Sequence, residues 1–125
     1  IVVYVYPGMS EACLLQQLET PGVRGIVLKT YGAGNAPTAK WFNEAIRKAV
    51  DRGLVILNVT QCVNGGVRQK RYYTGNLLDR AGVISGHDIT TEAALTKMMF
   101  LFGTGLNARQ VARCLHHPLC GEMTV

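Results

Sequence analysis

The stretch that decides the fold runs over residues 25–60 and reads GIVLKTYGAGNAPTAKWFNEAIRKAVDRGLVILNVT. It opens and closes on short apolar runs, residues 25–28 and 54–59, of the kind found in strands buried on both faces. Between them lie a glycine loop and a helix pattern that Pro37 or Thr38 opens. Strand, helix and strand in this order predict parallel strands joined by a right-handed crossover.

The helix between these strands has apolar residues at steps of three and four, while charged and polar residues cover its other face. This spacing predicts a helix that lies with one face on a sheet. The apolar positions are Trp41 or Phe42, Ala45, Ile46, Ala49 and Val50.

The same unit precedes this stretch. Residues 1–6 form a β-branched and aromatic run that predicts a first strand. Ser10 then caps a helix over Glu11–Leu18. This helix is predicted to place three apolar residues near one face, namely Ala12, Leu15 and Leu18.

After residue 60 the pattern predicts a short fourth strand at 82–84 and two helices. The first helix is expected at 91–102, and the second at Ala108–Leu115 with Asn107 as its cap. Residues 93–102 are apolar almost all round, which requires a buried position or a partner surface. We therefore expect one α/β domain over residues 1–125, a three-layer α/β/α sandwich with a small, mostly parallel, Rossmann-like sheet.

Composition favours an ordered globular chain, with 48% hydrophobic and 17% charged residues. The net charge is +5, but the basic residues are scattered except for Arg68, Lys70 and Arg71, which we interpret as a solvated loop. Aromatic residues are not interleaved with them, so we expect no nucleic-acid partner. Residues 98–102 form the longest strongly apolar stretch, far below the ~20 that cross a bilayer, so no membrane association is expected.

Four cysteines without a regular framework predict reduced thiols in a cytoplasmic protein. The chain opens at Ile1 inside a strand-like run and without an initiating Met, which indicates a piece of a longer protein.

Ligands of open parallel sheets bind beyond the carboxyl ends of the strands. Here those ends carry residues 6–10, 29–35 and 60–66, and we expect all three segments at one edge. Their glycines let backbone amides approach a ligand, and the helix starts that follow favour an anion such as an amino-acid carboxylate. The GAGN loop lacks the spacing of a nucleotide-binding fingerprint, so no phosphate cofactor is expected.

Other residues with reactive side chains have structural interpretations. No base is evident beside any candidate nucleophile, and Thr90 and Thr91 are interpreted as helix caps. His87 and Asp88 are adjacent and are interpreted as the entry to the same helix. The candidate threonines are Thr30, Thr60, Thr74, Thr90, Thr91 and Thr96. A run of zinc-type ligands has no usual zinc-site spacing, so no metal is expected; it comprises Cys114, His116, His117 and Cys120.

An ordered set of motifs spans nearly the whole chain: YPGMS (6–10), KTYGAGNAP (29–37), VILNVTQC (55–62), YYTGNLLDRAGVISGHDITTEAALTKM (72–98) and HPLCGEMT (117–124). The set resembles the C-terminal domain of bacterial-type, cytoplasmic type I L-asparaginases. The asparaginase-like subunit of the archaeal glutamyl-tRNA amidotransferase shares this domain and is one alternative. An amino-acid-sensing binding module is another.

The resemblance implies a two-domain oligomeric enzyme in which a threonine attacks the side-chain amide of asparagine and ammonia is released. The catalytic threonines and their lysine belong to the N-terminal domain of such enzymes. The resemblance therefore implies that this piece is inactive alone. It would supply the dimer surface and part of the pocket for substrate or effector L-asparagine, with no cofactor. A preference for asparagine over glutamine stays open.

The resemblance also assigns site residues. Asn35 stands where the family has an asparagine that reaches the neighbouring subunit's active site; alternatively it caps the next helix or holds its loop. Lys29, Thr60 and Cys62 match an allosteric asparagine site, although the family site has arginine in place of Lys29, and lysine lacks the two-pronged grip on a carboxylate. Cys62 is alternatively a small buried residue at a strand end.

Overall fold

The computed structural model describes residues 1–68 and 73–125. Its sheet has four parallel strands in the order of the chain: β1 (Val2–Tyr4), β2 (Gly25–Thr30), β3 (Val55–Thr60) and β4 (Ile84–Ser85). The registers pair Val2 with Val27, Lys29 with Val59, and Leu57 with Ile84. Parallel pairing of all strands confirms the prediction from the strand and helix alternation.

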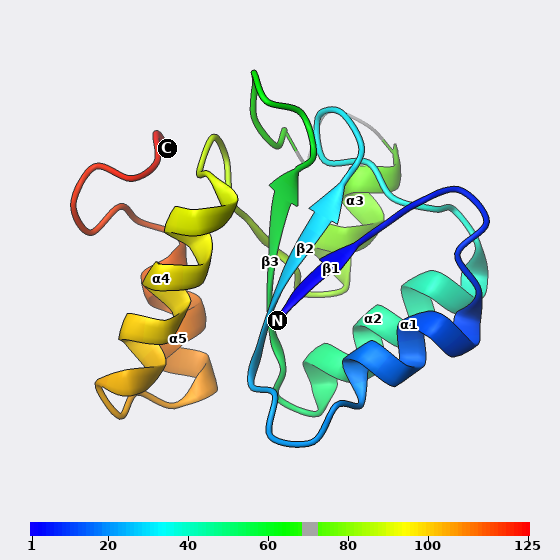
Figure 1. Ribbon diagram of the computed structural model, residues 1–125, viewed down its shortest axis with the longest axis horizontal. Helices are drawn as coiled ribbons and strands as arrows, with labels where there is room; N and C mark the ends of the chain where they lie inside the picture. Colours follow the sequence, from blue (N-terminus) through cyan, green and yellow to red (C-terminus); the bar gives the residue numbers. More distant parts are fainter. Residues whose placement is uncertain (69–72) are drawn as a thin grey trace.

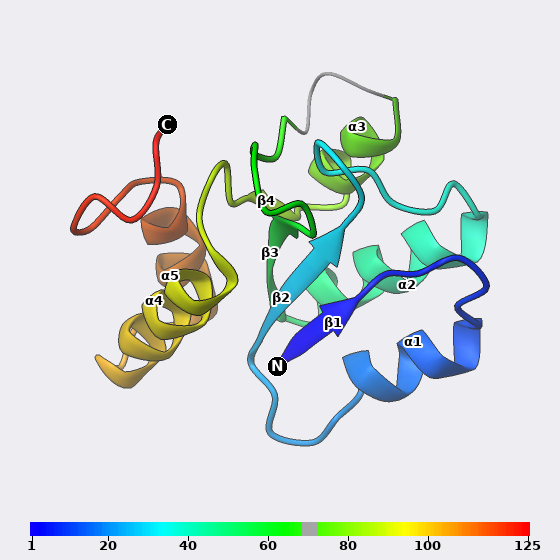
Figure 2. The same cartoon turned by 45° about the horizontal axis from the view of Figure 1, so that its top comes forward.

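Helices cover both faces of the sheet, with α1 (Glu11–Leu18), α2 (Lys40–Asp51) and α3 (Tyr73–Arg80) on one face (Figure 1). Crossovers of one hand that advance steadily across a sheet place every connecting helix on the same face. The other face is left to the two helices that follow the last strand, α4 (Thr91–Gly103) and α5 (Ala108–Leu115) (Figure 2). This arrangement confirms the three-layer α/β/α sandwich.

Each face has its own buried core, and β2 contributes to both. Ile26 and Leu28 point to the side of α1 and α2, whereas Val27 points to the side of α4 and α5. Strands covered on both sides are apolar at successive positions, which is why residues 25–28 show no alternation. The α4 side also buries Leu101, which explains part of the apolar character of that helix.

The helix α1 begins as predicted, because Ser10 Oγ accepts a hydrogen bond of 3.2 Å from Cys13 N. The predicted buried face of α1 was wrong in part. Leu14 and Leu18 are buried and Ala12 is exposed, since the helix is turned so that the larger Leu14 side chain fills the core.

The helix α2 begins at Lys40, later than the predicted start at Pro37 or Thr38. Ala39 has a non-helical backbone, with φ −55° and ψ 132°, and Asn43 Nδ2 donates to the carbonyl of Ala39 at 3.2 Å. The predicted apolar face is otherwise confirmed: Phe42, Ala45, Ile46 and Ala49 are buried, and Val50 packs against them half-buried.

The segment between β3 and β4 was the least well predicted. The helix α3 was missed, and β4 comprises Ile84 and Ser85 in place of residues 82–84. Gly82 has a φ of 86° and turns the chain from α3 toward the sheet, so it cannot belong to the strand. The proposed basic loop at Arg68 continues into Lys70 and Arg71, which lie outside the described residues.

The last elements agree closely with prediction. The helix α4 extends one residue past 102 to Gly103, and α5 has the predicted bounds. Asn107 caps α5 in a reciprocal box with Gln110. All four cysteines are free thiols. Within the described residues, no helix is long and apolar enough to span a membrane.

Candidate functional site

The segments that follow β1, β2 and β3 leave the same edge of the sheet (Figure 1). We call this edge the rim and define it as residues 6–10, 29–35 and 60–66. The side chain of Gln61 joins the strand ends, since its Nε2 donates to Val5 O at 2.6 Å and to Lys29 O at 2.9 Å. The predicted gathering of these segments at one edge is therefore present in the structure.

Lys29 is the buried charge of the rim, with 7% of its surface exposed. Its Nζ donates to Thr60 O at 2.5 Å and to Thr91 Oγ1 at 2.7 Å. Burial lowers the pKa of Lys29 from its ordinary value, and the electrostatic influence of nearby Glu92 and Cys62 partly offsets that effect. An ammonium has three N–H donors, so these two contacts leave one donor for a ligand.

Thr60 connects two rim segments. Its Oγ1 donates to Gly32 O at 2.5 Å and accepts from Cys62 N at 3.0 Å. The hydroxyl thus uses both its hydrogen and a lone pair to fix backbone, and Thr60 holds the shape of the rim. Cys62 is exposed, so the alternative that it is a small buried residue is wrong; it lies beyond the strand end, where the chain turns to solvent.

Asn35 closes the loop after β2. Its backbone forms two hydrogen bonds of 2.8 Å with Tyr31, one in each direction. Asn35 does not cap α2, because Ala39 is the N-cap residue of that helix. The alternative that Asn35 holds its loop agrees with these bonds. Its side chain is half-buried at the rim, where contact with a ligand stays a prediction.

Asn58, a polar residue that supports the rim, was missed from the sequence, and Thr30, considered there only as a candidate nucleophile, supports the rim with it. Asn58 is fully buried in β3, and its Nδ2 donates to Gly34 O at 3.3 Å. Thr30 Oγ1 donates to Asn58 Oδ1 at 2.5 Å. The available signal was an asparagine inside the apolar run at 54–59, because a buried amide requires partners. This network orients the backbone next to Asn35.

The two threonines at the start of α4 have different roles, and only one of them is the predicted cap. Thr90 caps α4 as predicted, accepting from Ala93 N at 3.2 Å, but Thr91 is no cap and faces Lys29 Nζ. The neighbour of Thr91 Oγ1 is therefore an amine side chain that the sequence did not predict there, Lys29. An ammonium that donates to both Thr60 O and Thr91 Oγ1 has no lone pair to accept a proton. The pair therefore positions Lys29 and does not activate a nucleophile.

Of the two remaining candidate threonines, one has a structural hydrogen-bond partner and the other has a side chain outside the described residues. Thr96 Oγ1 donates to Glu92 O at 2.9 Å inside α4, whereas the side chain of Thr74 lies outside the described residues. Asp88 accepts a hydrogen bond of 2.6 Å from Thr124 N, in agreement with a structural role near the start of α4.

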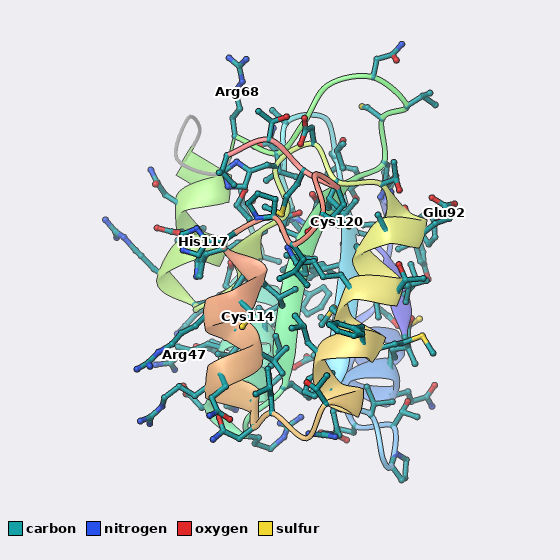
Figure 3. All side chains as sticks on the ribbon, turned by 90° about the vertical axis from the view of Figure 1, so that its left-hand side faces the viewer. Arg47, Arg68, Glu92, Cys114, His117 and Cys120 are labelled. Carbon is teal, nitrogen blue, oxygen red and sulfur yellow. The ribbon has the colours of Figure 1, made fainter. Side chains whose placement is uncertain are left out.

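The zinc-type residues at 114–120 are spread over a helix and the loop that follows. Figure 3 shows Cys114 on α5 and Cys120 in that loop. Cys120 N and Sγ both contact Glu122 Oε2, at 2.9 and 3.5 Å. In the described part of the chain, no three His, Cys, Asp or Glu side chains form a group suited to hold a metal ion.

A cavity of about 600 Å³ lies away from the rim, at the amino ends of β2 and β3, and is lined in part by Arg24, Arg52 and Phe102. Arg24 stacks on the Phe102 ring at 4.4 Å and donates to Leu106 O at 3.3 Å. Its guanidinium is therefore engaged within the fold. The rim is the better candidate, because Lys29 and Thr60 are buried polar residues at neighbouring strand ends and the half-buried Asn35 lies in the loop between those strands.

Known proteins match nearly the whole chain. A family model described as the glutaminase/asparaginase C-terminal domain covers residues 1–115. L-asparaginase 1 of Escherichia coli strain K12 is 42% identical over 123 residues, which are 98% of this chain and 36% of that protein. A glutamyl-tRNA(Gln) amidotransferase subunit from Pyrococcus furiosus is 36% identical over 123 residues, 98% of this chain and 27% of that protein.

The fold agrees with these matches. The crystal structure of L-asparaginase I from Vibrio cholerae superposes with a TM-score of 0.93 at 40% identity, covering 99% of this chain and 37% of that one. The chain spans about a third of the length of the L-asparaginases from Escherichia coli and Vibrio cholerae.

Proposed function

Because the chain belongs to the glutaminase/asparaginase C-terminal domain family, we propose that it is the C-terminal domain of an L-asparaginase, which hydrolyses L-asparagine to L-aspartate and ammonia. The likeness to L-asparaginase sequences and structures over almost its entire length carries this proposal. In this proposal the catalytic threonines lie in the part of the enzyme that these residues do not match.

The hydrogen bonds of the chain support a binding role in place of catalysis. Thr30, Thr60 and Thr91 each hold a neighbouring amide, carbonyl or ammonium group in place. A nucleophilic threonine needs a nearby group able to take its proton. The chemistry is therefore assigned to the other domain, and this domain is proposed to be inactive alone.

The rim is the proposed amino-acid site. A buried ammonium at Lys29, fixed by two hydrogen bonds, has one donor left for the carboxylate of a free amino acid. Thr60 and the exposed Cys62 lie on the next rim segment and complete the proposed effector site. Asn35 is proposed to contact the substrate of a neighbouring subunit through its side-chain amide.

The oligomer is proposed to use the outer side of α4. Met99 and Phe100 are 70% and 62% exposed there, and large exposed apolar side chains are typical of interfaces. The free thiols support a cytoplasmic location, because cysteines stay reduced in that compartment.

The match to the amidotransferase subunit favours a second candidate, an amidase subunit that supplies ammonia for glutamyl-tRNA amidation. The two candidates differ in their requirement for a partner. An asparaginase releases ammonia from free L-asparagine unaided, whereas an amidotransferase subunit is expected to depend on glutamyl-tRNA(Gln), the substrate in its name. Ammonia release by the protein that carries this chain, with and without tRNA, separates them.

Calorimetric titration with L-asparagine tests the rim. The protein that carries this chain is expected to bind L-asparagine, Lys29→Met to lose that binding at the rim, and Lys40→Met to keep it. Lys40 is the matched control because its side chain is 90% exposed on α2. The proposal is refuted if the isolated 125-residue chain hydrolyses L-asparagine unaided, or if both variants bind equally well.

A further inference from the structure

One short segment, residues 85–91, connects four parts of the molecule, and we call it the joint. Gly86 N donates to Asn58 O at 2.8 Å, which ties the joint to β3. Val67 N donates to His87 O at 2.7 Å, which ties it to the chain next to the rim. Lys29 Nζ reaches Thr91 Oγ1 at its far end. The joint therefore fixes one of the two described acceptors of the rim ammonium.

The fourth contact of the joint comes from the C-terminal tail, residues 116–125. Thr124 N donates to Asp88 Oδ1 at 2.6 Å. The tail leaves α5 and folds back toward the start of α4 (Figure 3). The residue that receives the tail thus lies three positions before the threonine that holds Lys29.

The tail is anchored to α4 by a buried ion pair. Lys97 Nζ lies 2.6 Å from Glu122 Oε1, with side chains only 3% and 10% exposed. Lys97 also donates to His117 O at 2.6 Å and to Met123 Sδ at 3.3 Å. All three donors of this ammonium are directed at the tail, so the tail is held on both sides of Glu122.

The carboxylate of Glu122 in turn fixes the turn of the tail. It accepts from Leu119 N at 3.0 Å and from Cys120 N at 2.9 Å. Met123 is buried in the core that α4 and α5 share. The ion pair, the hydrogen bonds of Glu122 to the backbone and the buried Met123 side chain together fix the position of the tail. In this position Thr124 N lies within hydrogen-bond distance of Asp88 in the joint.

We propose that the C-terminal tail is a strap that holds the joint, and that Thr91 is a positioning residue through which the strap orients Lys29 toward a ligand at the rim. The inference deepens the proposed function, because it assumes that the rim binds an amino acid. Releasing Asp88 from Thr124 frees the start of α4, moves Thr91 away from Lys29, and loosens the ammonium that grips the carboxylate.

The test uses the protein that carries this chain and compares two removals with two conservative replacements. Asp88→Ala and Thr91→Val remove the acceptor oxygens, whereas Asp88→Asn and Thr91→Ser keep them. Asp88 and Thr124 are exposed, so the Asp88 variants retain the buried core. Asp51→Ala, at an exposed position on α2, is the matched control for loss of a surface carboxylate.

Hydrogen exchange by mass spectrometry reports the strap directly. Both removals are expected to speed exchange in residues 29–35 and 60–66 and to leave α1 and α2 unchanged, whereas general destabilisation speeds exchange in all of them. L-asparagine is expected to bind about tenfold more weakly, the loss typical of one charge-assisted hydrogen bond. Asp88→Asn, Thr91→Ser and Asp51→Ala are expected to match the unmodified protein in both measurements.

The outcomes separate this inference from the proposed function. Faster exchange after Asp88→Ala that is confined to residues 116–125 overturns the strap. Binding within twofold of the unmodified protein after both removals overturns the positioning role of Thr91. An unmodified protein that binds no L-asparagine overturns the proposed function, and the exchange pattern then decides the strap by itself.

Discussion

Replacing Glu122 by glutamine is the sharpest perturbation of stability that the structure offers. The substitution keeps the size of the side chain and one acceptor oxygen, but it removes the negative charge that faces Lys97. That lysine side chain is 3% exposed, so water does not replace the lost partner. The variant therefore leaves a buried ammonium with only neutral acceptors.

The expected loss follows from the burial of the pair. Removing one partner of a buried ion pair costs about 3–5 kcal/mol. We expect the lower end, about 3 kcal/mol, because the glutamine oxygen still accepts from backbone amides. A domain of this size unfolds with roughly 6–19 kcal/mol, so the loss is a large fraction of the total. It corresponds to a fall in Tm of about 10–15 °C.

The matched control is Glu44→Gln, which breaks the exposed pair between Lys40 and Glu44 at 3.7 Å. Exposed pairs at this helical spacing contribute about 0.3–0.5 kcal/mol, so Tm is expected to fall by about 2 °C or less. Lys97→Met combined with Glu122→Gln removes both charges and is expected to recover most of the lost stability.

The pH dependence gives an independent check on the same pair. Burial by itself raises the pKa of Glu122, but hydrogen bonds from Lys97 and from the Cys120 and Leu119 amides outweigh it, and the pKa lies well below its ordinary value of 4.5. A group with a lowered folded pKa stabilises the fold above its unfolded pKa and loses that effect as pH falls below it. The difference in Tm between the unmodified protein and Glu122→Gln is therefore expected to become smaller below about pH 4.5.

Thermal unfolding followed by circular dichroism from pH 3 to pH 8 measures both effects. If Glu122→Gln lowers Tm no more than Glu44→Gln at neutral pH, the tail is not anchored by this ion pair, and the reasoning is refuted.

Two further predictions concern the joint and the rim. Gly86→Ala is expected to destabilise the chain by about 1–3 kcal/mol, because a Cβ at this position lies 2.6 Å from Asn58 O. Gly103→Ala meets no atom within 4 Å at the end of α4 and is expected to stabilise by about 0.5–1 kcal/mol; denaturant titration compares them, and equal effects contradict the packing argument. L-asparagine affinity is expected to fall with rising pH earlier than an ordinary lysine allows, because the pKa of Lys29 is lowered by burial. Lys29→Arg is expected to shift this fall to higher pH in calorimetry, and an identical pH profile for the variant and the unmodified protein contradicts this assignment.

The sequence predicted the elements whose signals are local. Ser10, Thr90 and Asn107 cap the helices that follow them, because a cap depends on residues within one turn. The apolar runs of β2 and β3 predicted buried parallel strands, since a sheet covered on both faces imposes that pattern. The helix α3 was missed because the sequence has no Ser, Thr, Asp or Asn directly before Tyr73 and only two adjacent leucines, Leu77 and Leu78, as apolar residues in its second half.

The rim was predicted in outline, because parallel strands necessarily bring their carboxyl ends to one edge. The partners of its polar groups were not. Thr91 lies 62 residues from Lys29 in the chain, and Thr124 lies 36 residues from Asp88. The spacing of apolar residues along the sequence cannot predict such pairs, because it indicates only which face of a helix or strand is apolar.

The chain by itself determined the α/β order, the caps, the buried faces of most elements and the edge at which a ligand would bind. Only the tertiary structure decided that Thr91 holds Lys29, that Asn58 supports the loop at Asn35, and that Lys97 fixes the tail through Glu122. The physical reason is that a buried polar group takes whichever partner the packed elements bring within about 3 Å, and that choice is made by the whole fold.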